Sequence, residues 1–239
     1  MWSATEDGSL HMTNSIEYVS PIMAENNFEE EIKRHIRQIP NSSVESCCGL
    51  HIHLGTADLS WWELLNFLNY CIKYEDFFFG IVSQSRRDNS YCKRLPVFLP
   101  KITTKAGFIA FMYGRPNMHT RQSDKYPSAR GGRVHRYWWI NIHSHFYRKT
   151  IEIRLHQGSV NATKIINWFK LWLKIIPVAI KGEQAWKPPS EIIGKELLDY
   201  YKSRNYIRST VFYETAQTAD QTSTSSIFVS SDSGTDTPF

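Results

Sequence analysis

The stretch Gly49-Leu50-His51-Ile52-His53-Leu54-Gly55 constrains the fold most, because apolar residues alternate with two histidines between glycines. Side chains that alternate in this way lie on opposite faces of a β-strand, so His51 and His53 share one face. Their imidazoles are then about 6.6–6.8 Å apart along the strand. Two imidazoles on one face can share a metal site, or serve a metal and a phosphate side by side. The pattern also fits a half-buried strand whose polar face merely carries histidine.

A second alternating strand is predicted over residues 150–156. Its isoleucines and its leucine share one face, whereas Glu152, Arg154 and His156 share the other. A carboxylate, a guanidinium and an imidazole are costly to bury without partners. They fit a face that looks into a site for a cation and an anion, such as a metal–nucleotide complex. The alternative is an exposed face on which Glu152 and Arg154 form a weak ion pair.

Composition limits the classes of protein that the chain can belong to. A hydrophobic content of 41% over 239 residues supports a packed core, and the net charge of +5 without a basic run argues against nucleic acid as a partner. The four cysteines form no C-x-x-C pair, which suits reduced thiols in the cytoplasm. Residues 1–13 lack the apolar core of a signal peptide, and the apolar segment 165–180 is too short and too charged to span a membrane. We therefore expect a cytoplasmic protein without a membrane partner.

The predicted elements point to an α+β domain. We expect strands over residues 10–12 and 15–19, and a hairpin of strands 136–145 and 150–156 joined by a turn at 147–149. We expect helices over residues 28–39, 60–79, 105–113, 161–180 and 191–204. Residues 83–94 read as a loop, in which Arg86 is either an anion-binding arginine or a solvated side chain. Together these elements predict a curved, mostly antiparallel sheet with helices packed on one face, in a domain spanning residues 1–205. Residues 206–239 read as a disordered Ser/Thr-rich tail.

One face of that sheet is expected to collect the charged and imidazole side chains of several strands. These side chains are Glu17, His51, His53, Glu152 and Arg154.

Several motifs, in their order and spacing, carry a resemblance to a known family. They are Asp7-Gly8-Ser9, the run from Glu17 to Pro21, the run from Gly49 to His53, Tyr91-Cys92, and the run from Thr150 to Gly158. Together they resemble the amidoligase family of the carboxylate–amine ligase superfamily, which includes glutamine synthetase and the glutamate–cysteine ligases. The resemblance covers roughly residues 5–180. It implies a glutamine synthetase-like catalytic domain.

The resemblance also implies a reaction, in which an acid and an amine are joined at the expense of ATP through an acyl phosphate. Such chemistry needs Mg²⁺ and arginines at the phosphoryl group in transfer. By resemblance, Glu17, His51 and Glu152 would bind Mg²⁺, and His53 would reach an ATP phosphate. Arg154 would bind and stabilise the transferring phosphoryl group, with Arg86 as a further contact to substrate or phosphate. The acid and amine could be free amino acids, peptides or cell-wall fragments.

Members of that family carry an earlier strand with a Gly-x-Glu-x-Glu type motif, which has no counterpart here. We therefore expect an N-terminally incomplete domain, and the main alternative is a catalytically inactive remnant that binds nucleotide or metal. A zinc-dependent hydrolase using His51, His53 and a further histidine or Glu152 is a second alternative. A cysteine hydrolase using Cys92 with His143 or His156 is a third, although no neighbouring group would lower the pKa of the thiol.

Overall fold

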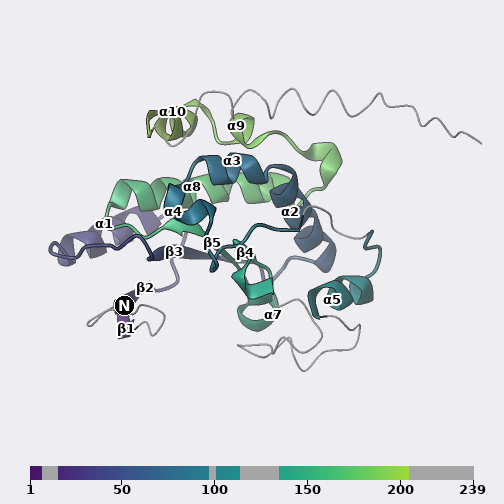
Figure 1. Cartoon of the computed structure of the whole chain (residues 1–239), viewed down its shortest axis with the longest axis horizontal. Helices are drawn as coiled ribbons and strands as arrows, with labels where there is room; N and C mark the ends of the chain where they lie inside the picture. The colour runs from purple at the N-terminus through teal and green to yellow at the C-terminus, as the bar shows by residue number, and fades with distance from the viewer. Residues whose placement is uncertain (7–15, 97–100, 114–134, 205–239) are drawn as a thin grey trace, which may run out of the picture.

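The computed structural model describes residues 1–6, 16–96, 101–113 and 135–204. The expected strand at residues 10–12, the Asp7-Gly8-Ser9 motif and the tail from residue 206 lie outside the described residues. The chain forms an α+β fold (Figure 1). Its elements are β1 (Ser3–Glu6), β2 (Ile16–Val19), α1 (Phe28–Gln38), β3 (Gly49–Gly55), α2 (Trp61–Lys73), α3 (Glu75–Gly80), α4 (Gln84–Arg87), α5 (Lys105–Tyr113), a 3-10 turn (His135–Tyr137), β4 (Ile140–Asn141), α7 (His143–Arg148), β5 (Thr150–Gln157), α8 (Ala162–Ala179), a second 3-10 turn (Glu183–Ala185), α9 (Pro189–Ile192) and α10 (Lys195–Ser203).

Within the described residues the strands form two antiparallel sheets rather than one. The larger sheet has the order β3-β5-β4, with β5 in the centre, and the smaller pairs β1 with β2. Glu17 lies opposite Thr5 in this second sheet and is exposed. The expectation that Glu17 shares a sheet with His51 and Glu152 is therefore wrong, because β2 pairs with the segment just before it and Pro21 then ends the strand.

The pairing of β3 with β5 contains a register shift that changes which side chains share a face. His53 lies opposite Glu152 and Ile52 opposite Ile153, but Leu50 lies opposite His156. Two steps along β3 thus correspond to three along β5, the signature of a β-bulge. Because directly opposed residues point to the same face, His156 joins Leu50 on the apolar face. Strict alternation placed His156 beside Glu152 and Arg154, and the bulge overturns that assignment.

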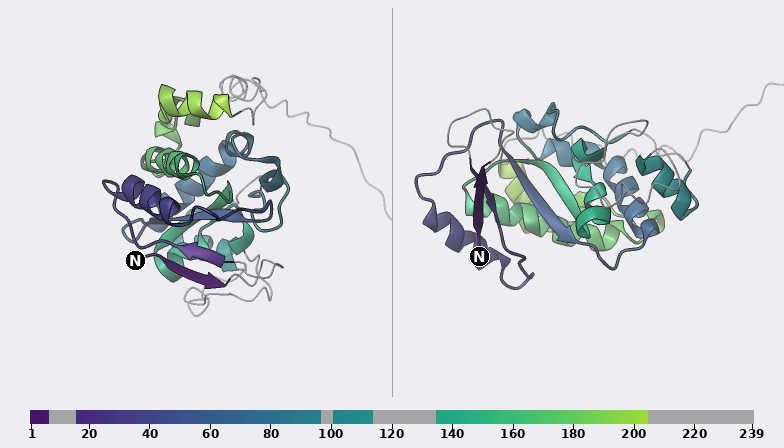
Figure 2. Two further views of the ribbon diagram at one scale, coloured as in Figure 1. Left: turned by 90° about the vertical axis from the view of Figure 1, so that its left-hand side faces the viewer. Right: turned by 90° about the horizontal axis from the view of Figure 1, so that it is seen from below.

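The core lies between the larger sheet and the helices above it in Figure 1. Helix α8 lies on the same side of β3 and β5 as α2 and α3, whereas α7 and β1–β2 lie on the other side (Figures 1 and 2). Trp139, Trp168 and Trp172 are fully buried. Trp139 and Trp168 both pack against Trp172, and the ring of Phe78 stacks on Trp172 at a centroid distance of 4.8 Å. The apolar faces of β3 and β5 close this core from below. The opposite face of the sheet is left for polar side chains.

Three helices have nearly the bounds predicted from the sequence, because residues that favour helix ends lie at their termini. Helix α1 has acidic residues in its first turn and ends before Pro40. Helix α8 begins after Asn161, whose side chain accepts a hydrogen bond from the backbone of Lys164 at 3.1 Å. Helix α5 has the predicted bounds. In the described ranges, no helix combines the length and the apolar character that crossing a membrane requires.

Two predicted helices are each divided in the structure. The helix expected over residues 60–79 starts at a capping box between Ser60 and Glu63 but breaks at Tyr74. There Glu75 Oε1 accepts hydrogen bonds from the Leu95 backbone and from Trp139 Nε1, both at 2.8 Å. The helix expected over 191–204 divides into α9 and α10 at Gly194, whose φ of +81° is outside the range of a right-handed helix.

The segments predicted as a loop over 83–94 and a strand over 136–145 also differ from the structure. The loop contains the short helix α4. Of the predicted strand only Ile140–Asn141 pairs with β5, and α7 follows it directly. His143 is held by the Tyr113 hydroxyl at 2.7 Å and His145 by Thr56 at 3.0 Å. These buried hydrogen bonds favour a helical turn where alternation alone suggested a strand.

Candidate functional site

A buried ion pair on the polar face of the larger sheet forms the centre of the candidate site. Arg154 Nη1 donates to Glu152 Oε1 at 2.5 Å, and both residues are 8% exposed. Asn141 on β4 lies opposite Glu152 and donates from Nδ2 to Oε2 at 2.6 Å. The guanidinium is fixed further by Nε, which donates to the backbone carbonyl of Tyr91 at 3.0 Å. Each carboxylate oxygen therefore has a donor, and the orientation of Arg154 is set from two sides.

The two histidines of β3 lie beside this pair, as the alternating pattern predicted. His51 Nδ1 is 3.3 Å and His53 Nε2 is 3.9 Å from Glu152 Oε1. About a third of each side chain is accessible, 29% for His51 and 33% for His53. His51, His53, Glu152 and Arg154 thus form one cluster, called the Glu152 cluster below. Its histidines provide the accessible side and its ion pair the buried side.

Two hydroxyl groups contact the side of the His53 ring that faces away from Glu152. Its Nδ1 lies 3.0 Å from Thr150 Oγ1 and 3.4 Å from Ser144 Oγ, and the two hydroxyls are 2.8 Å apart. These contacts leave Nε2 facing the cluster. Sequence reasoning missed both hydroxyls. The alternation of side chains along β5 could have indicated Thr150, which shares a face with Glu152 and Arg154. Ser144 could not be found in this way, because residues 136–145 were predicted to form a strand.

The charges of the cluster keep Glu152 ionised. Burial alone would raise the pKa of its carboxyl, but the hydrogen bond with His51 and the charges of Arg154, His51 and His53 outweigh burial and bring the pKa well below its usual range. For His53 the balance is reversed, because burial lowers its pKa even though Glu152 acts in the opposite direction. Near neutral pH the cluster therefore holds a carboxylate, a guanidinium and a neutral His53.

Arg86 lies behind the site rather than in it. Its side chain is 1% exposed and donates to the backbone carbonyls of Arg154 at 2.8 Å and Leu155 at 3.4 Å. Both residues belong to the register shift, where backbone carbonyls lose regular ladder partners. A guanidinium presents several donors in a fixed plane, which suits two neighbouring carbonyls. This geometry gives Arg86 a positioning role toward Arg154, whereas the sequence suggested contact with substrate or phosphate.

His156 is also outside the cluster. Its ring lies 5.0 Å from that of Trp168 on α8, and burial lowers its pKa to about 4. Cys92 is buried, donates from Sγ to the Arg86 carbonyl at 3.3 Å, and has its pKa raised by burial. A buried thiol held in its protonated form is a poor nucleophile. The geometry therefore lends no support to a cysteine hydrolase built on Cys92.

The fit of a metal ion can be judged from the donor set. Within the described part of the chain, no three His, Cys, Asp or Glu side chains are arranged to hold a metal by themselves. Glu17, in the other sheet, does not complete the predicted trio with His51 and Glu152. Mg²⁺ in nucleotide enzymes, however, is bound by one or two carboxylates together with phosphate oxygens and water. Glu152 can serve as that carboxylate, because Oε2 keeps a lone pair beyond the hydrogen bond that it accepts from Asn141. The residues therefore fit a Mg²⁺ that is shared with a nucleotide.

Comparison with known proteins gives one finding of similarity. The family model described as "Putative amidoligase enzyme" matches residues 3–176. None of the curated proteins and none of the solved structures is significantly similar to the chain. The matched segment begins in β1, ends within α8 and includes all four residues of the Glu152 cluster. The match spans well over half of the 239 residues, and the chain therefore belongs to the amidoligase family.

Proposed function

We propose that the Glu152 cluster catalyses the ATP-dependent joining of a carboxylate to an amine. The observation that carries this proposal is the buried Glu152–Arg154 pair with two partly accessible histidines on one side. Phosphoryl transfer is catalysed mainly by positioning and by charge stabilisation, and a fixed guanidinium beside a cation-binding carboxylate can provide both. Membership of the amidoligase family supports a ligase at this site.

The proposed reaction has two steps. The acid substrate's carboxylate attacks the γ-phosphorus of ATP, which releases ADP and forms an acyl phosphate. The amine then attacks the acyl carbon, which forms the amide and releases inorganic phosphate and a proton. Arg154, held by Glu152 and the Tyr91 carbonyl, would stabilise the charge on the transferring phosphoryl group. A neutral His53 would approach a phosphate oxygen through Nε2.

Glu152 and His51 would hold the Mg²⁺, which when bound neutralises triphosphate charge. Asn141 adds a buried polar atom beside Glu152. Its Oδ1 is among the buried side-chain atoms of the described residues that have no hydrogen-bond partner. Because Nδ2 is engaged by Glu152, Oδ1 is oriented to accept a hydrogen bond, and the N–H of the amine substrate would supply it.

Trapping by hydroxylamine tests the reaction whichever amine is the natural substrate, because hydroxylamine itself attacks the acyl phosphate. The chain is incubated with ATP, Mg²⁺, hydroxylamine and a panel of amino acids, peptides and cell-wall fragments, and hydroxamate is measured. We expect hydroxamate with a subset of acids and a loss of about 100-fold or more in Glu152→Gln and Arg154→Met. Glu30→Gln and Arg37→Met, which change exposed residues of α1, serve as matched controls.

Calorimetry with Mg²⁺ and ATP shows whether a chain that forms no hydroxamate still binds nucleotide. Nucleotide binding without hydroxamate from any acid would contradict the ligase and support the binding remnant. No binding by a folded chain would contradict the proposed nucleotide site itself. Equal activity in Glu152→Gln and the wild-type chain would remove the cluster from the mechanism.

A further inference from the structure

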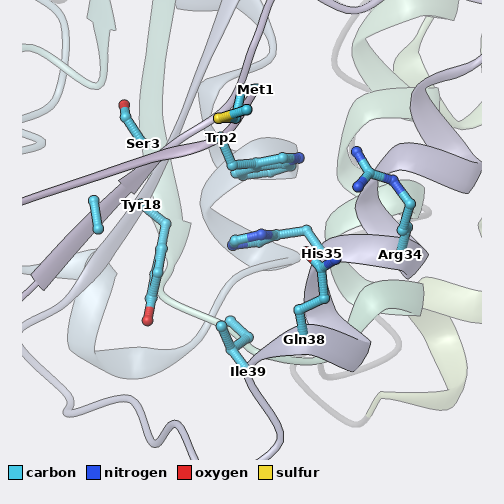
Figure 3. Close-up of a pocket in the computed structure, with 9 residues that line it drawn as sticks. Met1, Trp2, Ser3, Tyr18, Arg34, His35, Gln38 and Ile39 are labelled. Carbon is cyan, nitrogen blue, oxygen red and sulfur yellow. The ribbon is translucent and has the colours of Figure 1, made fainter.

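A concave site apart from the Glu152 cluster lies between the β1–β2 sheet and the second half of α1. It is a pocket of about 550 Å³, and its lining includes Trp2, Tyr18, Arg34, His35 and Gln38 (Figure 3). None of its lining residues belongs to the Glu152 cluster. The indole of Trp2 stacks on the imidazole of His35 with centroids 3.8 Å apart and planes 2° from parallel, and Tyr18 meets His35 edge-on at 5.0 Å. The rings are therefore held in a fixed arrangement.

Two polar atoms in this stack have no hydrogen-bond partner among the residues that the structure describes. Among the described residues, Trp2 Nε1 and His35 Nε2 are buried and make no hydrogen bond. His35 is only 6% exposed, although it lies in an otherwise amphipathic surface helix. Burying a polar group without a partner costs about 1–3 kcal/mol, so such groups in a folded protein call for a ligand, a strain or a functional reason. The indole N–H can only donate, and it therefore needs an acceptor.

The charge of the lining indicates the kind of acceptor. Arg34 is the charged side chain among the described lining residues, and no Asp or Glu lines the pocket there. One guanidinium nitrogen of Arg34 pairs with Glu31, which leaves other donors of the group available. In Figure 3 the nitrogen of the Trp2 indole lies at the end of the ring nearer to Arg34. Burial lowers the pKa of His35, so its ring is neutral near pH 7. The pocket thus combines apolar ring surface with donors and a positive charge.

We propose that this pocket binds a small ligand that carries a carboxylate on an apolar body. The carboxylate accepts hydrogen bonds from Arg34 and from the indole N–H of Trp2. The apolar body lies against Met1, Tyr18 and Ile39, which line the same pocket. A polar group of the ligand, such as an amide, meets His35 Nε2. This binding needs no nucleotide and does not depend on the proposed ligase activity.

The test uses N-acetyl-L-phenylalanine as the probe, with the full chain and without ATP. Binding is followed by calorimetry and by the indole N–H resonance of Trp2, which is assigned by its loss in Trp2→Phe. We expect saturable binding that shifts this resonance. We expect affinity to fall about tenfold in Trp2→Phe and in Arg34→Gln, the loss of one hydrogen bond to a charged group. Arg37→Gln, the same change at an exposed position of α1, should bind like the wild-type chain.

Two reference probes show whether binding depends on the carboxylate and on the apolar body of the ligand. N-acetyl-L-phenylalaninamide lacks the carboxylate and acetate lacks the apolar body, and each should bind at least about tenfold more weakly. Absence of saturable binding by the folded wild-type chain would overturn the proposal. Equal affinity in the wild-type chain, Trp2→Phe and Arg34→Gln would overturn it too, since binding would then occur elsewhere. Circular dichroism of each variant confirms that the comparison is between folded proteins.

Discussion

At the scale of single residues, the role that we propose for Arg154 depends on the neighbours that hold its side chain and backbone in place. Glu152 holds one nitrogen of the guanidinium, the Tyr91 carbonyl holds another, and Arg86 holds the backbone carbonyl of Arg154 itself. Catalysis by charge stabilisation requires donors that are already in place when the charge develops. In the proposed mechanism, the buried contacts of Arg154 therefore serve catalysis as well as the stability of the sheet.

Replacement of Arg86 tests this dependence. We expect Arg86→Met to lower the free energy of unfolding by about 2–4 kcal/mol, because the carbonyls of Arg154 and Leu155 lose their buried donor. Urea denaturation measures the loss. Arg86→Lys should retain less than half of the stabilisation, since an ammonium cannot reach both carbonyls in one plane.

The exposed Arg37 provides the control, because Arg37→Met should change stability by less than about 0.5 kcal/mol. If Arg86→Met unfolds at the same urea concentration as the wild-type chain, the role assigned to Arg86 is wrong. In a folded Arg86→Lys variant, hydroxamate formation should fall with little change in nucleotide affinity, as expected for a residue that orients rather than binds.

At the scale of elements, the bulge in β5 decides which side chains enter the core. His156 lies opposite Leu50 and packs against Trp168, with a pKa lowered by burial to about 4 from its ordinary 6.5. Between these two pH values the unfolded chain binds a proton at His156 that the folded chain does not bind. Stability therefore rises with pH across this window and is lost as the pH falls toward 4.

The size of this effect can be measured by urea denaturation at several pH values. We expect His156 to contribute about 3 kcal/mol of pH dependence between pH 4 and 6.5. His156→Gln removes this titrating group and should reduce the slope over that interval, while the lowered pKa values of His35, His53 and His145 preserve part of it. The pH dependence that comes from Glu152 lies lower, because its pKa is depressed, and should remain in the variant. Identical slopes in the two proteins would contradict the burial of a neutral His156.

The same scale shows what could be predicted from the sequence. Alternation placed His51, His53, Glu152 and Arg154 correctly, since period two is a local property of the strand. It misplaced His156, because a bulge depends on pairing with a distant strand. Alternation also failed to predict α7, because the buried hydrogen bonds of His143 and His145 are made to residues distant in the sequence. Helices α1 and α8 were predicted well because charges, caps and prolines next to them mark their ends.

At the scale of the whole molecule, the core extends beyond the segment that matches the family. Ile193, Leu197 and Tyr201 are buried in the same core as β5 and α8. Two hydroxyls anchor this C-terminal part, since Tyr70 donates to the Lys187 carbonyl at 2.9 Å and Tyr201 to the Asn167 carbonyl at 3.2 Å. The described residues after 176 are therefore integrated with the domain.

Truncation of a buried side chain of α10, which leaves a cavity in the core, tests whether this part folds with the rest of the domain. We expect Leu197→Ala to lower the free energy of unfolding by about 2–4 kcal/mol and to keep a single transition. Leu198→Ala changes the partly buried neighbour and should cost less. Unfolding followed by tryptophan fluorescence and by far-ultraviolet circular dichroism should coincide. Two separate transitions, with the first alone sensitive to Leu197→Ala, would show that α9 and α10 unfold independently.

The bulge also has a consequence for how this strand tolerates change. A deletion of one residue at position 154 or 155 would remove the extra residue and restore regular pairing, with His156 still opposite Leu50. Loss of Leu155 would take a buried side chain out of the core, whereas loss of Arg154 would turn the side chain of Leu155 toward the polar face. Insertions and deletions in β5 should consequently be far rarer among functional variants than single substitutions at the same positions. The extra residue in β5 thus fixes the length of the strand as firmly as its composition.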